Sequence, residues 1–256
     1  MDPEKNIKNT QSIKGETQNT QNDKCQRKVN IITIDGPAGS GKSTVSKLLA
    51  RELGLRYIDT GAMYRAITLV ALENGIDLQD EKAILEAAKR KKLEVDLRAN
   101  DENEYTQVKI DGRDVSLDIR SKEVGEAVSI VSRLSGIRRY LVELQREMAQ
   151  GGNAILEGRD TGSVVCPDAI LKIFLTASID ERVKRREKQN ISKGQIMNRE
   201  EIKKEIINRD RIDSTREDSP LVVPENGIVI DTTNMSIREV VEEIKDRYLE
   251  RINAKD

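Results

Sequence analysis

The sequence contains no histidine among its 256 residues, and this absence excludes several kinds of catalytic site. Without imidazole there is no Ser-His-Asp triad, no histidine general base and no histidine-ligated metal centre. Any chemistry must therefore use carboxylates, lysine, arginine and backbone amides. Two cysteines, Cys25 and Cys166, are too few and too far apart for a disulfide framework or a zinc site built from CxxC pairs.

Aromatic residues and long apolar runs are also scarce. With no tryptophan and one phenylalanine, Ile, Leu, Val and Ala must fill the core, which is typical of a parallel sheet covered by helices. No apolar run approaches the roughly 20 residues of a membrane span, and no signal peptide is visible. The 44 basic side chains balance 45 acidic ones, so no net charge attracts nucleic acid or membrane. We expect a soluble, cytoplasmic protein that binds neither.

Residues 1–28 differ in composition from the rest of the chain. They are rich in Asn, Gln, Thr and Lys, which predicts a disordered polar tail. A mitochondrial or chloroplast transit peptide fits less well, because Arg27 is the only arginine and four acidic residues are present.

After this tail, short buried-strand candidates alternate with helix-length segments, which predicts an α/β fold with a doubly wound parallel sheet. The strand candidates are Val29 to Ile34, Arg56 to Ile58, Ala154 to Leu156, Ile170 to Leu175 and Ile228 to Ile230. Capping boxes at Ser178 to Glu181 and Ser236 to Glu239 predict two helix starts.

One stretch breaks this alternation. Leu93 to Leu97 and Val108 to Gly112 show the period of short strands, and they surround a polar loop, Arg98 to Tyr105. The pattern predicts an inserted antiparallel patch.

Residues 36 to 43, Gly-Pro-Ala-Gly-Ser-Gly-Lys-Ser, match the phosphate-binding loop GxxxxGK[ST] between a predicted strand and a predicted helix. The glycines let backbone N–H groups face a phosphate, and the helix adds its positive end. We expect Lys42 to bridge the β- and γ-phosphates of ATP and the Ser43 hydroxyl to bind Mg²⁺. The expected nucleotide-binding residues are Gly36, Pro37, Ala38, Gly39, Ser40, Gly41, Lys42, Ser43 and Thr44. The loop leaves the reaction open, because GTPases, motors, transporters and kinases share it.

A second phosphate site is predicted at Asp59-Thr-Gly-Ala-Met-Tyr-Arg65, which follows a strand candidate. Thr60 is placed to cap the next helix, whose N-terminus attracts anions, and Arg65 could clamp a phosphate there. An ordinary capped helix with a surface arginine is the alternative.

Basic residues also gather on the helix that follows Ser178. Arg182, Arg185 and Arg186 share one face and repel each other unless a triphosphate supplies the opposite charge, as under a closing lid. A solvated charged face is the alternative. Gly194, with Ser192 and Lys193, has the composition of a flexible lid tip.

Three motifs, IDGPAGSGKST, DTGAMYR and EGRDTG at Glu157 to Gly162, occur in the order and spacing of bacterial cytidylate kinases, which the chain resembles over about residues 30–252. The resemblance implies a three-layer P-loop kinase fold with its core at 29–85, 122–180 and 215–256. A monophosphate-binding insertion would span about 86–121, and a lid about 181–214. It also implies transfer of the γ-phosphoryl group of ATP to CMP or dCMP in pyrimidine nucleotide metabolism. We expect a monomer.

The resemblance further implies roles for named residues. The acceptor phosphate would be held by Thr60, Arg65 and Arg159, with Tyr64 packed beside the nucleotide. The cytosine base would be read by Ser129, Arg138 and Asp160, since a carboxylate accepts from its amino group while serine and arginine donate to its ring acceptors. The pattern alone predicts that Ser129 and Arg138 are ordinary helix-surface residues. The monophosphate would also meet Arg209, Asp213 and Arg216, with Asp213 on the ribose hydroxyls.

Charge around the transferred phosphoryl group is expected from Lys42 of the loop, from Arg182 and Arg186 of the basic helix and, by the resemblance, from Arg159 and Arg216. Glu157 is a candidate to orient Mg²⁺-bound water, and Asp35 is a second candidate, with capping of the turn as its equal alternative. For Arg209, Asp213 and Arg216, a surface salt-bridge ladder would give the same spacing.

Two rival functions remain open from the sequence. A P-loop kinase for UMP, AMP or shikimate would share everything except the base-reading residues. A non-enzymatic nucleotide-binding switch would hydrolyse or exchange nucleotide without phosphorylating an acceptor.

Overall fold

The computed structural model describes residues 30–96, 106–192, 194 and 197–254. The predicted polar tail, the loop Arg98 to Tyr105 and Lys193 of the predicted lid tip lie outside the described residues. Within the described part of the chain, no helix is both long enough and apolar enough to cross a membrane.

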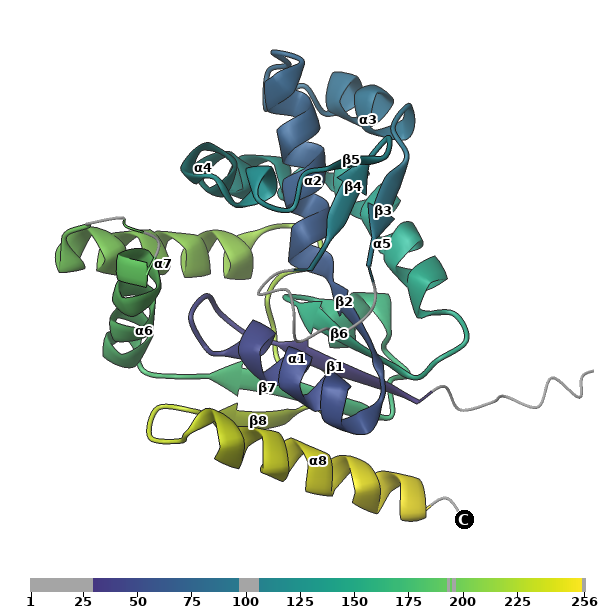
Figure 1. Cartoon of the computed structure of the whole chain (residues 1–256), viewed down its shortest axis with the longest axis vertical. Helices are drawn as coiled ribbons and strands as arrows, with labels where there is room; N and C mark the ends of the chain where they lie inside the picture. The colour runs from purple at the N-terminus through teal and green to yellow at the C-terminus, as the bar shows by residue number, and fades with distance from the viewer. Residues whose placement is uncertain (1–29, 97–105, 193, 195–196, 255–256) are drawn as a thin grey trace, which may run out of the picture.

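The central sheet has five parallel strands in the order β2-β6-β1-β7-β8 (Figure 1). The strands are β1 (Ile31–Asp35), β2 (Arg56–Asp59), β6 (Ala154–Gly158), β7 (Leu171–Thr176) and β8 (Ile228–Asp231). All five were predicted from the sequence, with ends that differ by at most two residues. Because parallel strands end at the same edge, the carboxyl ends of β1, β2 and β6 bring the three sequence motifs together.

Helices cover both faces of this sheet. On one face, α1 (Lys42–Leu53) and α8 (Ile237–Asn253) pack over β1 and β7, where Ile32 and Leu171 are fully buried. On the other face, α5 (Ser135–Ala149) contributes Val142 to a cluster with Ile58 and Leu156. The predicted three-layer α/β architecture is confirmed.

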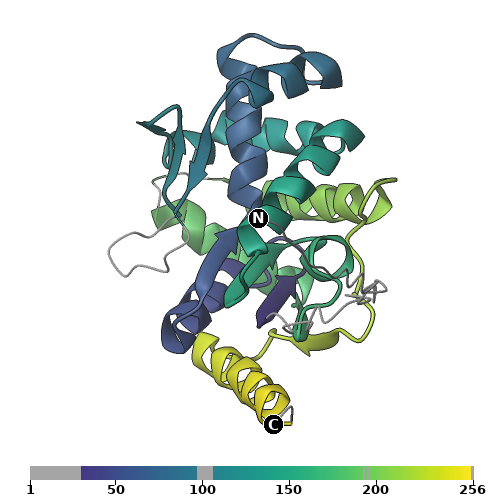
Figure 2. The same ribbon diagram turned by 90° about the vertical axis from the view of Figure 1, so that its right-hand side faces the viewer.

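A second, mainly helical body lies at the end of the molecule opposite α8 (Figures 1 and 2). It contains α2 (Thr60–Glu73), α3 (Glu81–Lys89), the 3₁₀ turn η1 (Asp118–Arg120), α4 (Lys122–Val131) and an antiparallel sheet of β3 (Leu93–Val95), β4 (Val108–Ile110) and β5 (Arg113–Asp114). The predicted antiparallel patch is confirmed. The sequence did not predict β5, because two exposed residues are too few to show a period.

This sheet packs on α2 through an apolar cluster that includes Ala66, Val70, Val108 and Val124. The cluster fixes α2 as the shared element between the two bodies, since the N-terminus of α2 begins directly after β2. The N-terminus of α2 therefore lies at the sheet edge where the phosphate-binding loop lies.

Helices α6 (Ile179–Ser192) and α7 (Arg199–Thr215) form an arm beside the sheet (Figure 1). A small apolar cluster of Val183, Ile202 and Ile206 joins them. The predicted capping box at Ser236 is confirmed in full. At Ser178, the Glu181 amide donates to the Ser178 hydroxyl at 3.3 Å, which is one half of the predicted box.

Candidate active site

The phosphate-binding loop joins the central strand β1 to α1. Gly36, Gly39 and Gly41 all have positive φ, at 147°, 79° and 95°, as the curled loop requires. Lys42 starts α1 and folds back across the loop, where its Nζ donates to the Pro37 carbonyl at 2.7 Å. Burial, together with the positive charge of Arg159, holds the pKa of Lys42 well below its ordinary value. A negatively charged ligand beside Lys42 would stabilise the charged form of the lysine and raise its pKa again.

Ser43 and Glu157 meet beside this loop. The Ser43 hydroxyl donates to Oε1 of Glu157 at 2.7 Å. The other carboxylate oxygen is buried near the Tyr57 hydroxyl, and neither atom has a partner with hydrogen-bond geometry among the described residues. Burial and the negative charge of Asp59 raise the pKa of Glu157 to about 7. A hydroxyl and an under-satisfied carboxylate are oxygen donors of the kind that Mg²⁺ prefers, so these residues fit that ion.

Asp35, the other candidate for the Mg²⁺ shell, directs its carboxylate elsewhere. Oδ1 accepts from the backbone amide and hydroxyl of Thr161 at 2.9 and 2.8 Å, and Oδ2 accepts from the Gly162 amide at 2.8 Å. These contacts favour the alternative in which Asp35 caps a turn, and that turn is the one after β6.

The prediction that Thr60 caps α2 is wrong. Asp59 is the N-cap: its backbone is extended, and its Oδ1 accepts from the Ala62 amide at 2.9 Å. Thr60 is already helical and buried, and its hydroxyl donates to the Glu157 carbonyl at 2.7 Å. Both residue types are good caps, so only the backbone torsions decide between them. Thr60 instead ties the first turn of α2 to β6.

Five basic groups from five segments of the chain are linked by electrostatic interactions between neighbours. They are Lys42, Arg65, Arg159, Arg186 and Arg209. Burial, with the charges of Arg159, Arg65 and Arg186, lowers the pKa of Arg209 to about 9. Burial, with the charges of neighbouring arginines, lowers the pKa of Arg65 to about 10. Burial disfavours the charged forms of Arg65 and Arg209, and the neighbouring positive charges add to that effect. Positive groups gathered in this way suit an anionic ligand.

One carboxylate organises three of the surrounding arginines. Asp213 accepts from Arg159 Nε at 2.8 Å, with Arg209 Nε at 4.0 Å and Arg216 Nη1 at 3.7 Å. The helical face predicted for Arg209, Asp213 and Arg216 does not extend to Arg216, because α7 ends at Thr215 and Arg216 has extended backbone, but Arg216 still lies beside Asp213. Asp213 and Arg216 are both buried, which excludes the surface-ladder alternative.

A buried polar cluster is built around Asp160. Arg138 Nη2 lies 2.5 Å from Asp160 Oδ2, and the Arg138 guanidinium stacks 5.2 Å from the centroid of the Tyr64 ring. Arg216 Nη2 approaches the other oxygen of Asp160 at 3.8 Å. Arg138 Nε and the Tyr64 hydroxyl are buried without hydrogen-bond partners among the described residues. Buried donors left unmatched in this way suit a small polar ligand.

The helical pattern predicted that Arg138 lies on the surface, and that prediction is wrong: the residue is 2% exposed. Hydrophobic periodicity assigns a charged side chain to the solvent side and cannot register a carboxylate 22 positions away. Ser129, on α4, is half-buried.

The arginines of α6 have separate surroundings. Arg182 is buried, and its Nη1 donates to Asp210 at 2.6 Å and to the Ala38 carbonyl of the phosphate-binding loop at 3.2 Å. Arg185 donates to the Thr232 carbonyl at 2.7 Å. Arg186 is exposed. Asp210 could not be identified from the sequence, because no local pattern signals a pair between two helices.

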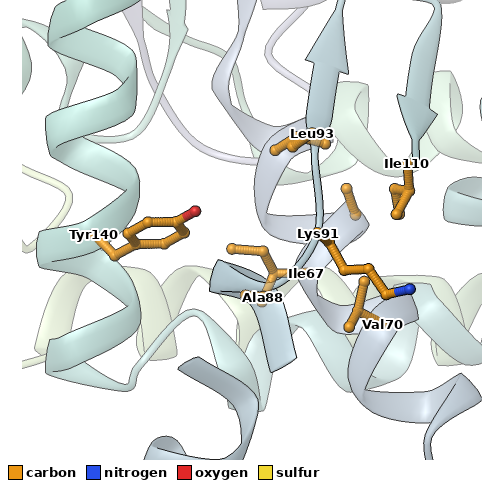
Figure 3. A pocket seen from close by; sticks show the side chains of 8 residues that line it. Ile67, Val70, Ala88, Lys91, Leu93, Ile110 and Tyr140 are labelled. Atoms are coloured by element: carbon orange, nitrogen blue, oxygen red, sulfur yellow. The ribbon is translucent and has the colours of Figure 1, made fainter. Parts of the chain in front are cut away.

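A small apolar crevice lies elsewhere, between α2, α3, β3, β4 and α5 (Figure 3). Ile67, Leu93, Ile110 and Tyr140 line it, and it includes none of the predicted site residues. Its one charged side chain, Lys91, forms an ion pair with Asp111 at 2.8 Å. The candidate active site is therefore located by the clustered charges and by the buried donors without partners, and not by this apolar crevice.

A phosphate-binding loop at the end of a parallel sheet, with Arg159 and Arg209 acting electrostatically on its lysine, defines the protein as a P-loop kinase of the kind that acts on small phosphorylated acceptors. The family profile described as cytidylate kinase matches residues 32–250. The chain belongs to the cytidylate kinase family.

Individual relatives agree with this family. The chain is 48% identical to the cytidylate kinase of Caldanaerobacter subterraneus subsp. tengcongensis, over 83% of this chain and 92% of that protein. It is 48% identical to the cytidylate kinase of Pelotomaculum thermopropionicum, over 84% and 94%, and 46% identical to that of Mycobacterium leprae, over 88% and 97%. A solved shikimate kinase from Acinetobacter baumannii is 15% identical with a TM-score of 0.40, over 87% of this chain and 94% of that one.

Proposed function

We propose that this chain transfers the γ-phosphoryl group of ATP to CMP, giving CDP and ADP, and that it also accepts dCMP. The observation that supports this most strongly is the gathering of Arg159, Arg209 and Arg216 around Asp213, because Arg159 and Arg209 also act electrostatically on Lys42. One phosphate chain would lie on the loop and the other on the arginines, end to end. The proposal includes a monomeric, cytoplasmic enzyme, in keeping with the balanced charge of the sequence.

On the donor side, the amides of residues 36–44 would hold the ATP phosphates, and Lys42 would bridge the β- and γ-phosphates. Arg182 already touches this loop at the Ala38 carbonyl, so it is placed to meet the donor from the α6 side. Arg186 is exposed and electrostatically coupled to Arg65 and Arg209, so it would approach the transferred group when the arm closes.

On the acceptor side, Thr60, Arg65, Arg159, Arg209 and Arg216 would hold the monophosphate, with Asp213 directed to the ribose. The three arginines around Asp213 are the support for this assignment. Asp160 would accept from the cytosine amino group, while Arg138 and Ser129 would donate to its ring acceptors. The stacked Tyr64 and Arg138 would form the wall against which the base lies.

The chemistry needs no covalent enzyme intermediate. The chain would align donor and acceptor, exclude water and neutralise the developing charge with Lys42 and the arginines. The acceptor phosphate is already largely ionised, so proton removal contributes little. Ser43 would hold a Mg²⁺ ion and Glu157 would orient its bound water, and the ion would supply neutralisation of the charge on the ATP phosphates.

Replacement of Glu157 by Gln tests the Mg²⁺ assignment. The change removes the negative charge but keeps an oxygen that can accept from Ser43. We expect the Mg²⁺ concentration needed for half-maximal ATP binding, measured by calorimetry, to rise about tenfold, because the ion loses an oriented partner. Mg²⁺-free ATP binding serves as the control and should not weaken. An unchanged Mg²⁺ requirement would contradict the role of Glu157.

An acceptor panel tests the function as a whole. ADP formation from ATP and Mg²⁺ is followed with CMP, dCMP, UMP, AMP and shikimate, each in turn. We expect CMP and dCMP to have the highest kcat/KM. A preference for UMP, AMP or shikimate would assign the chain to another kinase, and ADP formation indifferent to every acceptor would indicate a nucleotide-binding switch.

A further inference from the structure

The carboxylate of Asp35 connects the strand before the phosphate-binding loop to the turn that carries two acceptor-site residues. It is 1% exposed and receives three hydrogen bonds, two from Thr161 and one from Gly162. Thr161 lies 126 positions further along the chain, so this contact exists only in the tertiary structure. No hydrogen bond from Asp35 to the phosphate-binding loop is present among the described residues.

The contact of Asp35 with Thr161 matters because two acceptor-site residues lie between Thr161 and the end of β6. In the pairing of β1 with β6, Asp35 stands opposite Gly158. Gly158 is therefore held by the sheet and Thr161 by the Asp35 carboxylate. Only Arg159 and Asp160 lie between these two fixed points. The side chain of Arg159 reaches Asp213, and that of Asp160 reaches Arg138, so both belong to the acceptor site.

The turn is packed tightly against β1. A Cβ atom at Gly162 would lie 2.6 Å from Thr33 Oγ1 and 3.3 Å from Asp35 Oδ2, so the turn cannot approach with a larger residue. Its other end is also fastened, because Arg146 on α5 donates to the Val164 carbonyl at 2.7 Å. A short span held at both ends leaves its side chains few positions to occupy.

The charge on Asp35 is retained at an energetic cost. Burial raises the pKa of Asp35 to about 6, and the amide and hydroxyl groups of Thr161 and Gly162 oppose that rise. A neutral residue at this position would avoid the desolvation penalty but could not accept all three hydrogen bonds.

We propose that Asp35 is a positioning residue for the acceptor, which sets the places of Arg159 and Asp160 by fixing the turn that follows them. The inference rests on the proposed function, since it takes CMP as the acceptor. It assigns Asp35, which borders the ATP loop in sequence, to the CMP side of the reaction.

Asp35→Asn provides the test, because the amide keeps the shape but has one oxygen and cannot accept from every donor. We expect the KM for CMP to rise about tenfold, with the KM for ATP within about twofold of the parent enzyme. Thr33→Ser is the matched control. Thr33 lies on the same strand and is fully buried, and the serine keeps the hydroxyl oxygen against which Gly162 packs, so both KM values should stay unchanged.

A second variant covers the case in which Asp35→Asn fails to fold. Thr161→Val removes only the hydroxyl donor and leaves both amide donors in place, so we expect a rise of about threefold in the KM for CMP alone. Equal increases for ATP and CMP, or no increase for CMP in a folded variant, would overturn the inference while the parent enzyme still phosphorylates CMP. A parent enzyme that does not phosphorylate CMP would overturn the proposed function and the inference with it.

Discussion

Lys42→Ala is expected to lower kcat by about 10³-fold with every acceptor while leaving the fold intact. The loss is large because Lys42 is the group placed to neutralise charge on the transferred phosphoryl, and preorganised donors of this kind carry factors of about 10² to 10⁵. The loss is uniform because the lysine meets the donor, which all acceptors share.

The same substitution is not expected to destabilise the protein. Burial and the charge of Arg159 lower the pKa of Lys42, so the folded state disfavours its charged form. Removing the ammonium group relieves that penalty and offsets the loss of the hydrogen bond to the Pro37 carbonyl. The thermal midpoint should therefore stay unchanged or rise.

Rates with CMP, dCMP and UMP, together with the thermal midpoint, check this prediction. Arg51→Ala is the control, because Arg51 lies on the same helix, exposed, roughly 13 Å along its axis from Lys42. A Lys42→Ala variant that keeps a tenth or more of the parent rate, or loses one acceptor only, would contradict the assigned role.

Asp160→Ala is expected to abolish the preference for cytosine and lower kcat/KM for CMP by about 10³-fold. A site built to pair a substrate amino group discriminates strongly when that partner is removed. The preference for CMP over UMP, measured as the ratio of their kcat/KM values, should fall toward one.

This variant also threatens the fold, and the structure suggests how to separate the two effects. Arg138 is 2% exposed and pairs with Asp160, so removing the carboxylate leaves a buried charge uncompensated, at a cost of about 3 to 5 kcal/mol. The double variant Asp160→Ala, Arg138→Met removes both charges. We expect it to recover most of the lost stability while remaining unable to distinguish CMP from UMP.

To separate a base-reading role of Asp160 from a structural one, the thermal midpoint and the acceptor panel are measured on the parent, single and double variants. If the double variant regains stability and still prefers CMP, Asp160 does not read the base. If the single variant loses activity with all acceptors in equal proportion, its effect is structural.

Most of the fold was predictable because its signals are local. The five parallel strands are short apolar runs, and Gly54 ends α1 in the left-handed conformation that its glycine permits. The phosphate-binding loop is contiguous, so its glycines and Lys42 could be identified together. The antiparallel patch was visible in the period of two strands, while β5 was too short to show any.

The candidate site was less predictable, because its contacts join distant residues. The choice between Asp59 and Thr60 as helix cap depended on backbone torsions. The burial of Arg138 depended on Asp160, and the placement of Arg182 depended on Asp210, 28 positions away. In the sequence alone, each of these charged residues looks like an ordinary solvent-exposed residue.

By itself, the sequence determined where the strands, helix starts and phosphate-binding loop occur, because hydrophobic period, capping residues and glycine act within about ten residues of chain. Only the tertiary structure decided which charges are buried and which carboxylate each arginine meets. Coulombic and desolvation energies depend on distance through space, and residues far apart in the sequence acquire such distances only when the chain has folded.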